Sequence, residues 1–290
     1  MPTVSTLLYY GAPLTPEGQA DNWVIDAVSQ PPEQIWNFRK VAVETAITDL
    51  RDDKLHPRLD EMGFEKVVLP TEADHQALLE KSASALEQYE AETEALLKSL
   101  TRADAVVFFD ATVRHEDTDA SQDLPAQSAH LRVHVDQNPR SALARAVNHG
   151  GPERQFRRFQ IINIWRPLIQ PVRNFPLALC DYQSVDLSTD LVPTQLHFPA
   201  WLKDRENYSL KFNPDHRWYY WGSLSPDEAI IFKCYDSASR GLALVSQGTE
   251  RGDLLDVAGL CPHSAFFDEN GPTSGRLRTS LELRALLFYT

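Results

Sequence analysis

Hydrophobic and polar residues follow two different periods along the first third of the chain. Residues 4–10 (VSTLLYY) and 104–114 (DAVVFFDATVR) are rich in β-branched and aromatic residues, which predicts strands. Between residues 72 and 101, leucines recur at helical spacing among Glu, Lys and Gln, which predicts a long helix. Among the turns of residues 20–60 we expect a shorter helix at 41–50. This part of the chain is therefore predicted to be a mixed α/β region.

From about Ala129 the pattern becomes a series of short apolar segments separated by Pro, Asn, Asp and Gly, which is typical of a double-sheet roll. We predict an α+β fold: a double-stranded β-helix (jelly-roll) core at 126–290, with the helical N-terminal region of residues 1–125 packed against it. No flexible boundary is visible, so residues 1–290 are expected to form one domain. The expected strands are LRVHVDQ (131–137), RRFQIINIW (157–165), LALCDYQSV (177–185), HRWYYWGSL (216–224), EAIIFKCY (228–235), GLALVSQ (241–247) and LRTSLELRALLFYT (277–290).

Composition and charge narrow the class of protein. The 290 residues are 42% hydrophobic, enough for a packed core, and their formal net charge of −13 repels phosphates. We therefore expect neither a nucleic-acid nor a membrane partner. Cys180, Cys234 and Cys261 form no CxxC pair, which favours a reducing compartment, and Cys261 is expected to be a buried filler. No signal peptide or membrane span is visible, so we expect a soluble, cytoplasmic protein; a homodimer stays open.

The strongest chemical signal is His134-Val135-Asp136, followed 129 residues later (263 − 134) by His263. Residues i and i+2 of a strand project to one face, so His134 and Asp136 can share a cavity. Two histidines and one carboxylate form the facial triad that holds Fe(II) and leaves coordination positions open. His115-Glu116-Asp117 matches the same H-x-D pattern, but its acidic surroundings are typical of a solvated turn. We therefore predict His134, Asp136 and His263 as the catalytic metal ligands.

The last predicted strand carries a second cluster of polar residues. Arg278 and Ser280 lie on one face of it, and a planar guanidinium beside a hydroxyl suits a buried carboxylate. We predict that these two residues bind the distal carboxylate of 2-oxoglutarate. Arg276, on the same face but closer to the loop, is the alternative, and Arg284 is a further candidate. The competing interpretation is an exposed edge strand with a ladder of salt bridges.

Six short segments occur along the chain in a specific order, and together they resemble the fungal hydroxylase/desaturase family. That family includes the gibberellin desaturase-like enzymes and the cephamycin methoxylation component. The resemblance extends from about Thr6 to the C-terminus, and one departure is Ala111, where the family pattern has a histidine. The segments are NIWRPL (163–168), PLALCD (176–181), HRWYYW (216–221), KCYDS (233–237), PHSAFFD (262–268) and RTSLELRALLFY (278–289).

The resemblance implies a non-haem Fe(II)/2-oxoglutarate-dependent oxygenase of secondary metabolism. Its cofactors would be Fe(II) and 2-oxoglutarate, and its partners dioxygen and a small molecule that it hydroxylates, desaturates or cyclises. The alternative function is a non-catalytic accessory subunit of a biosynthetic oxygenase complex, although such a subunit need not retain the metal ligands. A cupin-like metal enzyme without an oxo acid would be expected to have an H-x-H motif, which the sequence lacks.

Aromatic residues suggest where a substrate binds. We predict Gln137, Trp165, Tyr220 and Phe267 as substrate contacts, because they follow the H-x-D motif or lie in the aromatic segments described above. These segments and the acidic net charge favour a largely apolar or amphipathic small molecule. We accordingly expect a cavity with few charges beyond the metal and co-substrate ligands.

Overall fold

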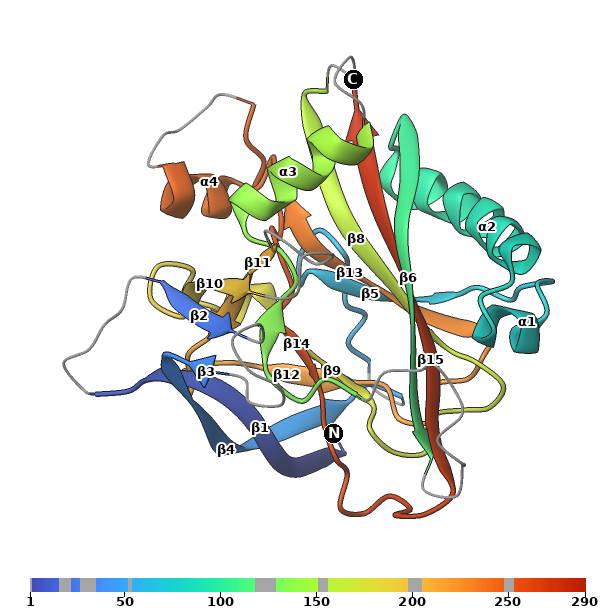
Figure 1. Cartoon of the computed structure of the whole chain (residues 1–290), viewed down its shortest axis with the longest axis horizontal. Helices are drawn as coiled ribbons and strands as arrows, with labels where there is room; N and C mark the ends of the chain where they lie inside the picture. The colour runs from blue at the N-terminus through green and yellow to red at the C-terminus, as the bar shows by residue number, and fades with distance from the viewer. Residues whose placement is uncertain are drawn as a thin grey trace.

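Two β-sheets of the computed structural model face each other across the interior (Figure 1). The structure describes residues 2–15, 22–26, 35–51, 54–117, 129–150, 156–197, 205–247 and 253–290. Within these residues the larger sheet has the order β1 (Thr3–Pro13), β4 (Phe38–Asp49), β12 (Trp218–Tyr220), β9 (Leu177–Cys180), β14 (His263–Ala265), β7 (His134–Val135), β11 (Arg205–Leu210), β10 (Leu191–His197), β2 (Trp23–Asp26) and β3 (Ile35–Trp36). The smaller sheet has the order β5 (Phe64–Val68), β13 (Glu228–Asp236), β8 (Arg158–Pro167), β15 (Arg276–Tyr289) and β6 (Ala105–Asp117).

The main hydrophobic core fills the space between the two sheets. Leu8 and Leu179 of the larger sheet belong to the same buried cluster as Ile161 and Phe232 of the smaller sheet. Side chains alternate between the two faces of a strand, so β15 contributes to both sides of its sheet. Leu283 points to the outer face, where a second cluster forms. The polar residues of β15 that alternate with the apolar ones are left to face the interior between the sheets.

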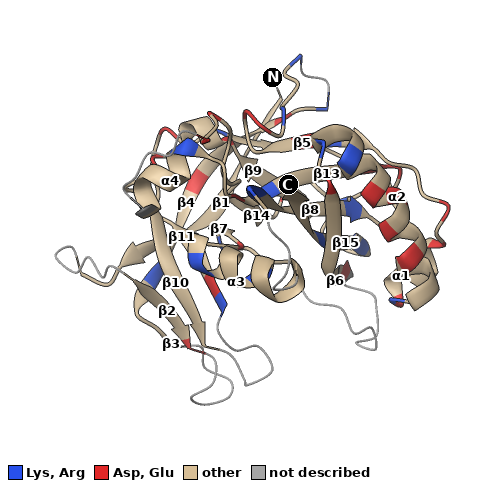
Figure 2. Ribbon diagram, turned by 90° about the horizontal axis from the view of Figure 1, so that it is seen from above, with Lys and Arg blue, Asp and Glu red and all other residues tan. Residues whose placement is uncertain are grey.

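Helices cover the outer face of the smaller sheet and one end of the interior. The longest helix, α2, packs on β6 and buries Leu97 against the outer cluster, while several acidic residues lie along it (Figure 2). α3 contacts β6, β11 and β15 at one end of the interior. The helical elements are α1 (His75–Leu79), α2 (Ala83–Thr101), α3 (Pro139–Gly150), the 3-10 helix η1 (Tyr182–Ser184) and α4 (Arg240–Gln247).

Two predictions of local structure were wrong and several were right only in part: the strands predicted at 131–137, 177–185 and 216–224 are limited to β7, β9 and β12. Residues 41–50 are not a helix: residues 41–49 lie in β4, antiparallel to β1, because the alternating β-branched residues of this segment favour an extended chain. Residues 241–247 form α4 rather than a strand, since Leu242 and Ala243 are buried on one side of a helical turn. The helix predicted at 72–101 is interrupted at Lys81, whose backbone φ of 56° is left-handed.

The N-terminal region contributes strands to both sheets. β1 and β4 form one edge of the larger sheet, and β5 and β6 form the two edges of the smaller one. The region predicted as residues 1–125 is thus interleaved with the rest of the chain and does not simply pack against it. A single domain over residues 1–290 stays a prediction.

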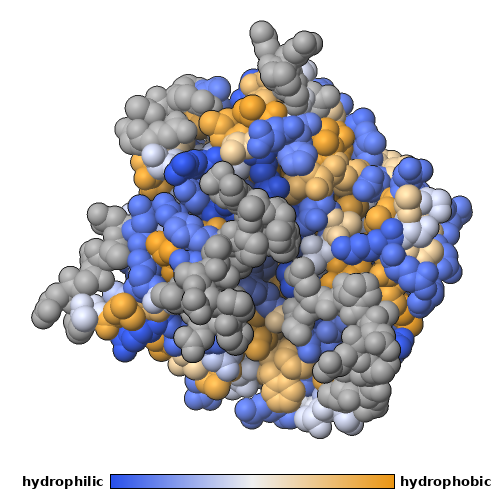
Figure 3. Space-filling view, viewed as in Figure 1, coloured by the Kyte–Doolittle hydropathy of each residue, from blue (hydrophilic) through white to orange (hydrophobic). Residues whose placement is uncertain are grey.

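Within the described residues, no helix has both the length and the apolar composition that are needed to cross a membrane. On the face seen in Figure 3, hydrophilic and hydrophobic residues are interspersed.

Candidate active site

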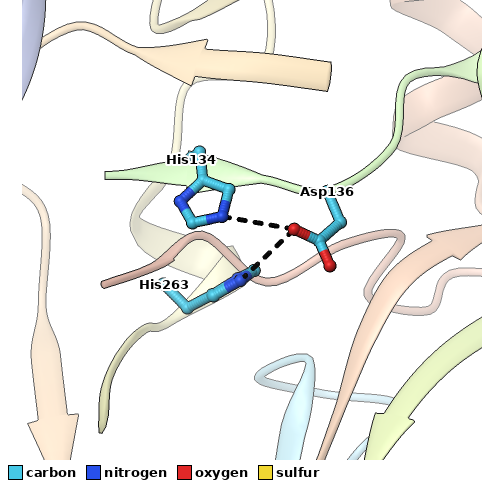
Figure 4. A group of neighbouring side chains, drawn as sticks. All are labelled: His134, Asp136 and His263. Atoms are coloured by element: carbon cyan, nitrogen blue, oxygen red, sulfur yellow. Dashed lines mark ion pairs between the residues drawn. The ribbon is translucent and has the colours of Figure 1, made fainter. Parts of the chain in front are cut away.

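Two neighbouring strands of the larger sheet bring the predicted metal ligands together. His134 of β7 and His263 of β14 are direct cross-strand partners, and Asp136 follows β7 by one residue (Figure 4). One Asp136 oxygen, Oδ1, lies 3.2 Å from Nε2 of His134 and 3.8 Å from Nε2 of His263. One ligand atom from each residue lies within 4.8 Å of the others. This cluster has the size and donor set of a mononuclear metal site.

The sequence after Asp136 explains why β7 is short. Asn138 caps α3: its side-chain oxygen accepts from the backbone N–H of Ser141, and its own N–H donates to the Ser141 hydroxyl. Pro139 then fits the first turn, where no backbone donor is required. The strand therefore ends beside Asp136, and the chain turns there into the helix. This Asn-Pro-x-Ser signal was available in the sequence, which makes α3 a helix that our prediction missed.

Both histidines are oriented by backbone carbonyl groups. Nδ1 of His134 lies 2.7 Å from the carbonyl oxygen of Arg132, and Nδ1 of His263 lies 3.0 Å from that of Cys261. A carbonyl can only accept, so each Nδ1 carries a proton and donates it, and in the neutral form of each ring Nε2 then has a free lone pair. Both lone pairs then face the Asp136 carboxylate. Three electron-rich atoms converging in this way repel one another unless a cation lies among them, so the residues fit a metal ion.

The second oxygen of Asp136 is held by the opposite sheet. Its Oδ2 accepts from Nδ2 of Asn163 at 2.9 Å and from Nε of Arg284 at 3.3 Å. Burial opposes ionisation of this carboxyl, but the positive charge of Arg284 outweighs it and holds the pKa of Asp136 well below the usual range. Burial, reinforced by the neighbouring His263, lowers the pKa of His134 to about 4. Asp136 is therefore charged and His134 neutral, as metal ligands must be.

Replacing Asn163 by alanine tests this positioning of Asp136. The variant is expected to bind the metal about 10- to 100-fold more weakly, because partners of that kind orient the ligand and are worth that much in other metal proteins. Titration with Mn(II), followed by calorimetry, measures the affinity. Asn148→Ala, an exposed change in the wall of the adjacent cavity, is the matched control. Equal metal affinity of the Asn163 and Asn148 variants would show that Arg284 alone suffices to hold Asp136.

A small cavity of about 20 Å³ joins all three triad residues to Arg278. The Arg278 guanidinium stacks 5.0 Å from the Trp165 ring centroid and donates to the Ser280 hydroxyl and to the carbonyl of Phe175. Among the described residues, no carboxylate lies within ion-pairing distance of it, and burial lowers its pKa to about 9. The volume holds about one water molecule, so a carboxylate reaches Arg278 only if these side chains shift.

A larger cavity of about 600 Å³ opens beside His134 and Asp136. The prediction of few charges in it was wrong: besides Asp136, its wall contains two acids and five arginines. The prediction failed because aromatic segments of the sequence became core, while basic residues of β6, β11 and α3 turned inward. The charged lining residues are Asp110, Asp136, Glu206, Arg114, Arg132, Arg145, Arg205 and Arg284.

The predicted substrate residues lie in different places. Gln137 lines the larger cavity. Trp165 lies beneath Arg278, whereas Tyr220 packs edge-on against Phe266 in the core. Phe267 packs against Phe175, and its carbonyl accepts from the Thr6 hydroxyl. The two cavities are lined by none of the predicted residues Trp165, Tyr220 and Phe267.

Several other residues of the sequence prediction can now be placed. His115 lies in β6, opposite Thr279 of β15, and not in a solvated turn; residues 118–123 of the predicted acidic loop lie outside the described residues. The His115 ring bonds to the Thr279 hydroxyl at 2.8 Å, because the long pairing with β15 extends β6 as far as Asp117. Arg276 lines neither cavity, and Cys261 is fully buried.

Two functional candidates were missed at the sequence level. Asn163 supports Asp136 from β8, and nothing in the sequence alone indicates which strand lies opposite. Arg132 lines the larger cavity and precedes His134 by two residues. Residues i and i+2 share a face, so strand parity could have identified it. His130, which shares that parity, lines both cavities.

Comparison with known proteins extends this description to the whole chain. Residues 8–288 match the family model described as "Oxidoreductase/YMDC permease-like domain". The chain is 29% identical to the hydroxylase/desaturase efuI of Hormonema carpetanum, over 99% of this chain and 96% of that protein. It is 33% identical to the Fe(II)/2-oxoglutarate-dependent dioxygenase nvfI of Aspergillus novofumigatus, over 69% of this chain and 66% of that protein.

A solved structure has the same fold. The iron and alpha-ketoglutarate-dependent endoperoxidase NvfI superposes with a TM-score of 0.82 at 25% identity, over 99% of this chain and 98% of the other. The predicted jelly-roll fold is thereby confirmed. The chain belongs to the fungal hydroxylase/desaturase family of Fe(II)/2-oxoglutarate-dependent oxygenases, as its sequence segments predicted.

Proposed function

We propose that this chain is an Fe(II)/2-oxoglutarate-dependent oxygenase that oxidises a small secondary metabolite, with His134, Asp136 and His263 as its iron ligands. The observation that carries the proposal is the orientation of the two imidazoles. Each donates from Nδ1 to a backbone carbonyl and turns Nε2 toward the same oxygen of Asp136. The family supports iron and 2-oxoglutarate as the cofactors, because its named members depend on them.

The residues of this chain have separable tasks in such a reaction. When bound, iron and 2-oxoglutarate together supply the oxidation of a C–H bond by dioxygen, with loss of carbon dioxide from the oxo acid. Asn163 and Arg284 keep one oxygen of Asp136 occupied, so the other is presented to the metal. Arg278 would hold the distal carboxylate of 2-oxoglutarate with help from the Ser280 hydroxyl, which already bonds its Nε. The larger cavity would then orient the substrate.

Several finer points belong to the same proposal. Hydroxylation, desaturation and ring formation remain alternatives, because the carbon nearest the metal decides the product. Among the described residues the three cysteines are buried free thiols, which supports a reducing, cytoplasmic location. The accessory-subunit alternative has less support, because the geometry of the triad is intact.

Anaerobic crystals soaked with Fe(II) and 2-oxoglutarate test the proposal directly. Anomalous diffraction at the iron edge is expected to place one ion within bonding distance of His134, Asp136 and His263. The oxo acid should chelate that ion and direct its far carboxylate to Arg278. In solution, succinate should form from 2-oxoglutarate only when Fe(II) is present. Iron elsewhere, or 2-oxoglutarate binding with no contact to the ion, would contradict the proposal.

A further inference from the structure

Arg132 is a buried cation in the wall of the larger cavity, and the proposed chemistry gives it no task. Only 5% of its surface is exposed. One guanidinium nitrogen, Nη1, donates to the Ser209 hydroxyl at 2.6 Å, and the guanidinium lies 6.0 Å from the Trp36 ring centroid. Its Nε is buried without a hydrogen-bond partner among the described residues. Within the same part of the chain, no carboxylate lies within ion-pairing distance of it.

Such an arrangement is costly for a protein that has no anion to place there. A buried charge without a counter-ion destabilises the folded state by several kcal/mol unless it is paired. The surroundings nevertheless fix the guanidinium in position. Thr194 bonds to the Ser209 hydroxyl at 2.7 Å and thereby holds the acceptor of Arg132 in place. A guanidinium that is held rigid, desolvated and incompletely bonded is organised to bind an anionic ligand.

The wall of the larger cavity is positively charged, whereas the protein as a whole is negatively charged. Five arginines against three carboxylates give its wall a formal charge of +2 (5 − 3), although the whole chain carries −13. Arg284 is neutralised by Asp110, Asp136 and Glu282. Arg132 is not neutralised in this way. A positive cavity in an acidic protein selects anions, because its low-dielectric walls focus the field of the charges.

Among the arginines that line the two cavities, Arg132 and Arg278 are the buried ones without an ion pair within the described residues, and the co-substrate accounts for only one of them. 2-Oxoglutarate has two carboxylates, and the one beside the keto group is needed to chelate iron. Only the distal carboxylate is free to bind an arginine, and Arg278, in the small cavity that touches all three triad residues, is placed for it. Arg132 lines the larger cavity and not the small one. It is therefore left for a second anionic group.

The rest of the cavity wall describes the remainder of that ligand. Ile25, Trp36 and Leu196 give it an apolar side. Two buried amide oxygens, Gln137 Oε1 and Asn207 Oδ1, have no partner within the described residues and can accept hydrogen bonds. A ligand with an apolar body, a hydroxyl or N–H group and a negative group would satisfy all of these positions.

We propose that the substrate is an amphipathic carboxylic acid whose carboxylate binds the Arg132 guanidinium while its apolar body packs against Ile25, Trp36 and Leu196. This inference rests on the proposed function for the identity of the reaction, and on Arg132 alone for the carboxylate. It replaces the expectation of a weakly charged cavity. Arg132 is here a specificity-determining residue: it selects and orients the substrate and takes no part in the oxidation.

Matched pairs of carboxylic acids and their methyl esters test the proposal. Dodecanoic, 2-naphthoic and abietic acid, each beside its methyl ester, are titrated by calorimetry into the protein loaded with Mn(II) and 2-oxoglutarate, which binds without turnover. At least one acid is expected to bind roughly 10- to 100-fold more tightly than its ester, the usual worth of a charged hydrogen bond. If no acid exceeds its ester, including the case in which none binds below about 1 mM, the proposal is wrong.

Variants assign the preference to Arg132. Arg132→Gln should reduce the acid-to-ester ratio to within about twofold, because the buried charged donor is lost. Arg132→Lys keeps the positive charge but loses the planar guanidinium, so it should retain part of the acid-to-ester ratio. This variant tests the role of Arg132 if the Gln variant does not fold. Arg39→Gln, an exposed change on β4, should bind like the wild type. An unchanged ratio in both Arg132 variants would overturn the assignment.

The same samples separate this proposal from the proposed function. If Mn(II) or 2-oxoglutarate does not bind to the wild type, the oxygenase assignment fails, and acids and esters are then compared on the unloaded protein. If both bind but no acid preference appears, only the carboxylate proposal fails. A third result would also overturn it: loss of 2-oxoglutarate affinity in Arg132→Gln but not in Arg278→Gln would mean that Arg132 holds the co-substrate.

Discussion

Replacing Asp136 by alanine is expected to abolish metal binding and turnover while the protein stays folded. The carboxylate is the one anionic donor of the triad, and its loss leaves two neutral imidazoles. Metal affinity should fall by more than about 100-fold, since loss of a supporting partner alone already costs 10- to 100-fold. Titration with Mn(II) followed by calorimetry measures the affinity, and succinate formation from 2-oxoglutarate measures the activity.

The matched control for this prediction is the other H-x-D motif. His115→Ala removes a histidine from a partly buried strand position, where its ring bonds to the Thr279 hydroxyl. We expect this variant to bind Mn(II) with the wild-type affinity. Circular dichroism shows whether each variant folds. Normal metal binding by a folded Asp136→Ala protein, together with its loss in His115→Ala, would transfer the metal site to the first motif.

The sequence predicted the fold where side-chain alternation coincided with burial. The C-terminal segment was predicted as a strand because Leu281, Leu283 and Ala285 alternate with polar residues, and β15 indeed buries these three in the outer cluster. Residues 41–50 were predicted wrongly although β-branched residues alternate there, because the alternation coincides with little burial: in β4 most of these side chains are only half-buried or exposed. Pairing with β1 decides the structure of β4, and pairing between distant segments cannot be read from one of them alone.

The candidate site was predictable to the extent that it follows strand parity. His134 and Asp136 could be recognised because they are two residues apart, and His263 because of its order in the chain. Asn163 and Arg284 could not be assigned to Asp136, because they come from the opposite sheet. Their contact depends on how two sheets face each other, which is set by packing throughout the core.

The character of the cavity was the largest error, and its origin is physical. Tyr220 was predicted as a substrate contact, but it is buried, as is its neighbour Trp218, which donates from its indole N–H to the hydroxyl of Tyr10. Aromatic residues stabilise a core best where their polar atoms find partners, and here the core supplies them. The cavity wall instead contains Arg132, Arg145 and Arg205. The acidic composition of the whole chain gave no indication that these arginines gather in one place. Net charge describes the whole surface and says little about one cavity.

Replacing Arg278 by glutamine is expected to weaken 2-oxoglutarate binding by on the order of 10²-fold or more, the usual consequence of removing one partner of a buried charge pair. Arg278 is 2% exposed, and Ser280 Oγ and the carbonyl of Phe175 fix the direction of its guanidinium. Glutamine keeps a hydrogen-bond donor but supplies no charge. Mn(II) affinity should not change, because Arg278 contacts none of the three triad residues by a hydrogen bond or ion pair within the described part of the chain.

Arg276→Gln is the comparison that decides between the two arginines at the start of β15. Arg276 lines neither cavity, so its loss should leave the dissociation constant of 2-oxoglutarate within about twofold of the wild type. Calorimetric titration of 2-oxoglutarate into each Mn(II)-loaded variant measures both constants. The cost of the Arg278 change arises because the distal carboxylate loses a buried cationic partner while it stays shielded from water. A large effect in Arg276→Gln and none in Arg278→Gln would reverse the assignment, and equal effects would place the carboxylate between the two side chains.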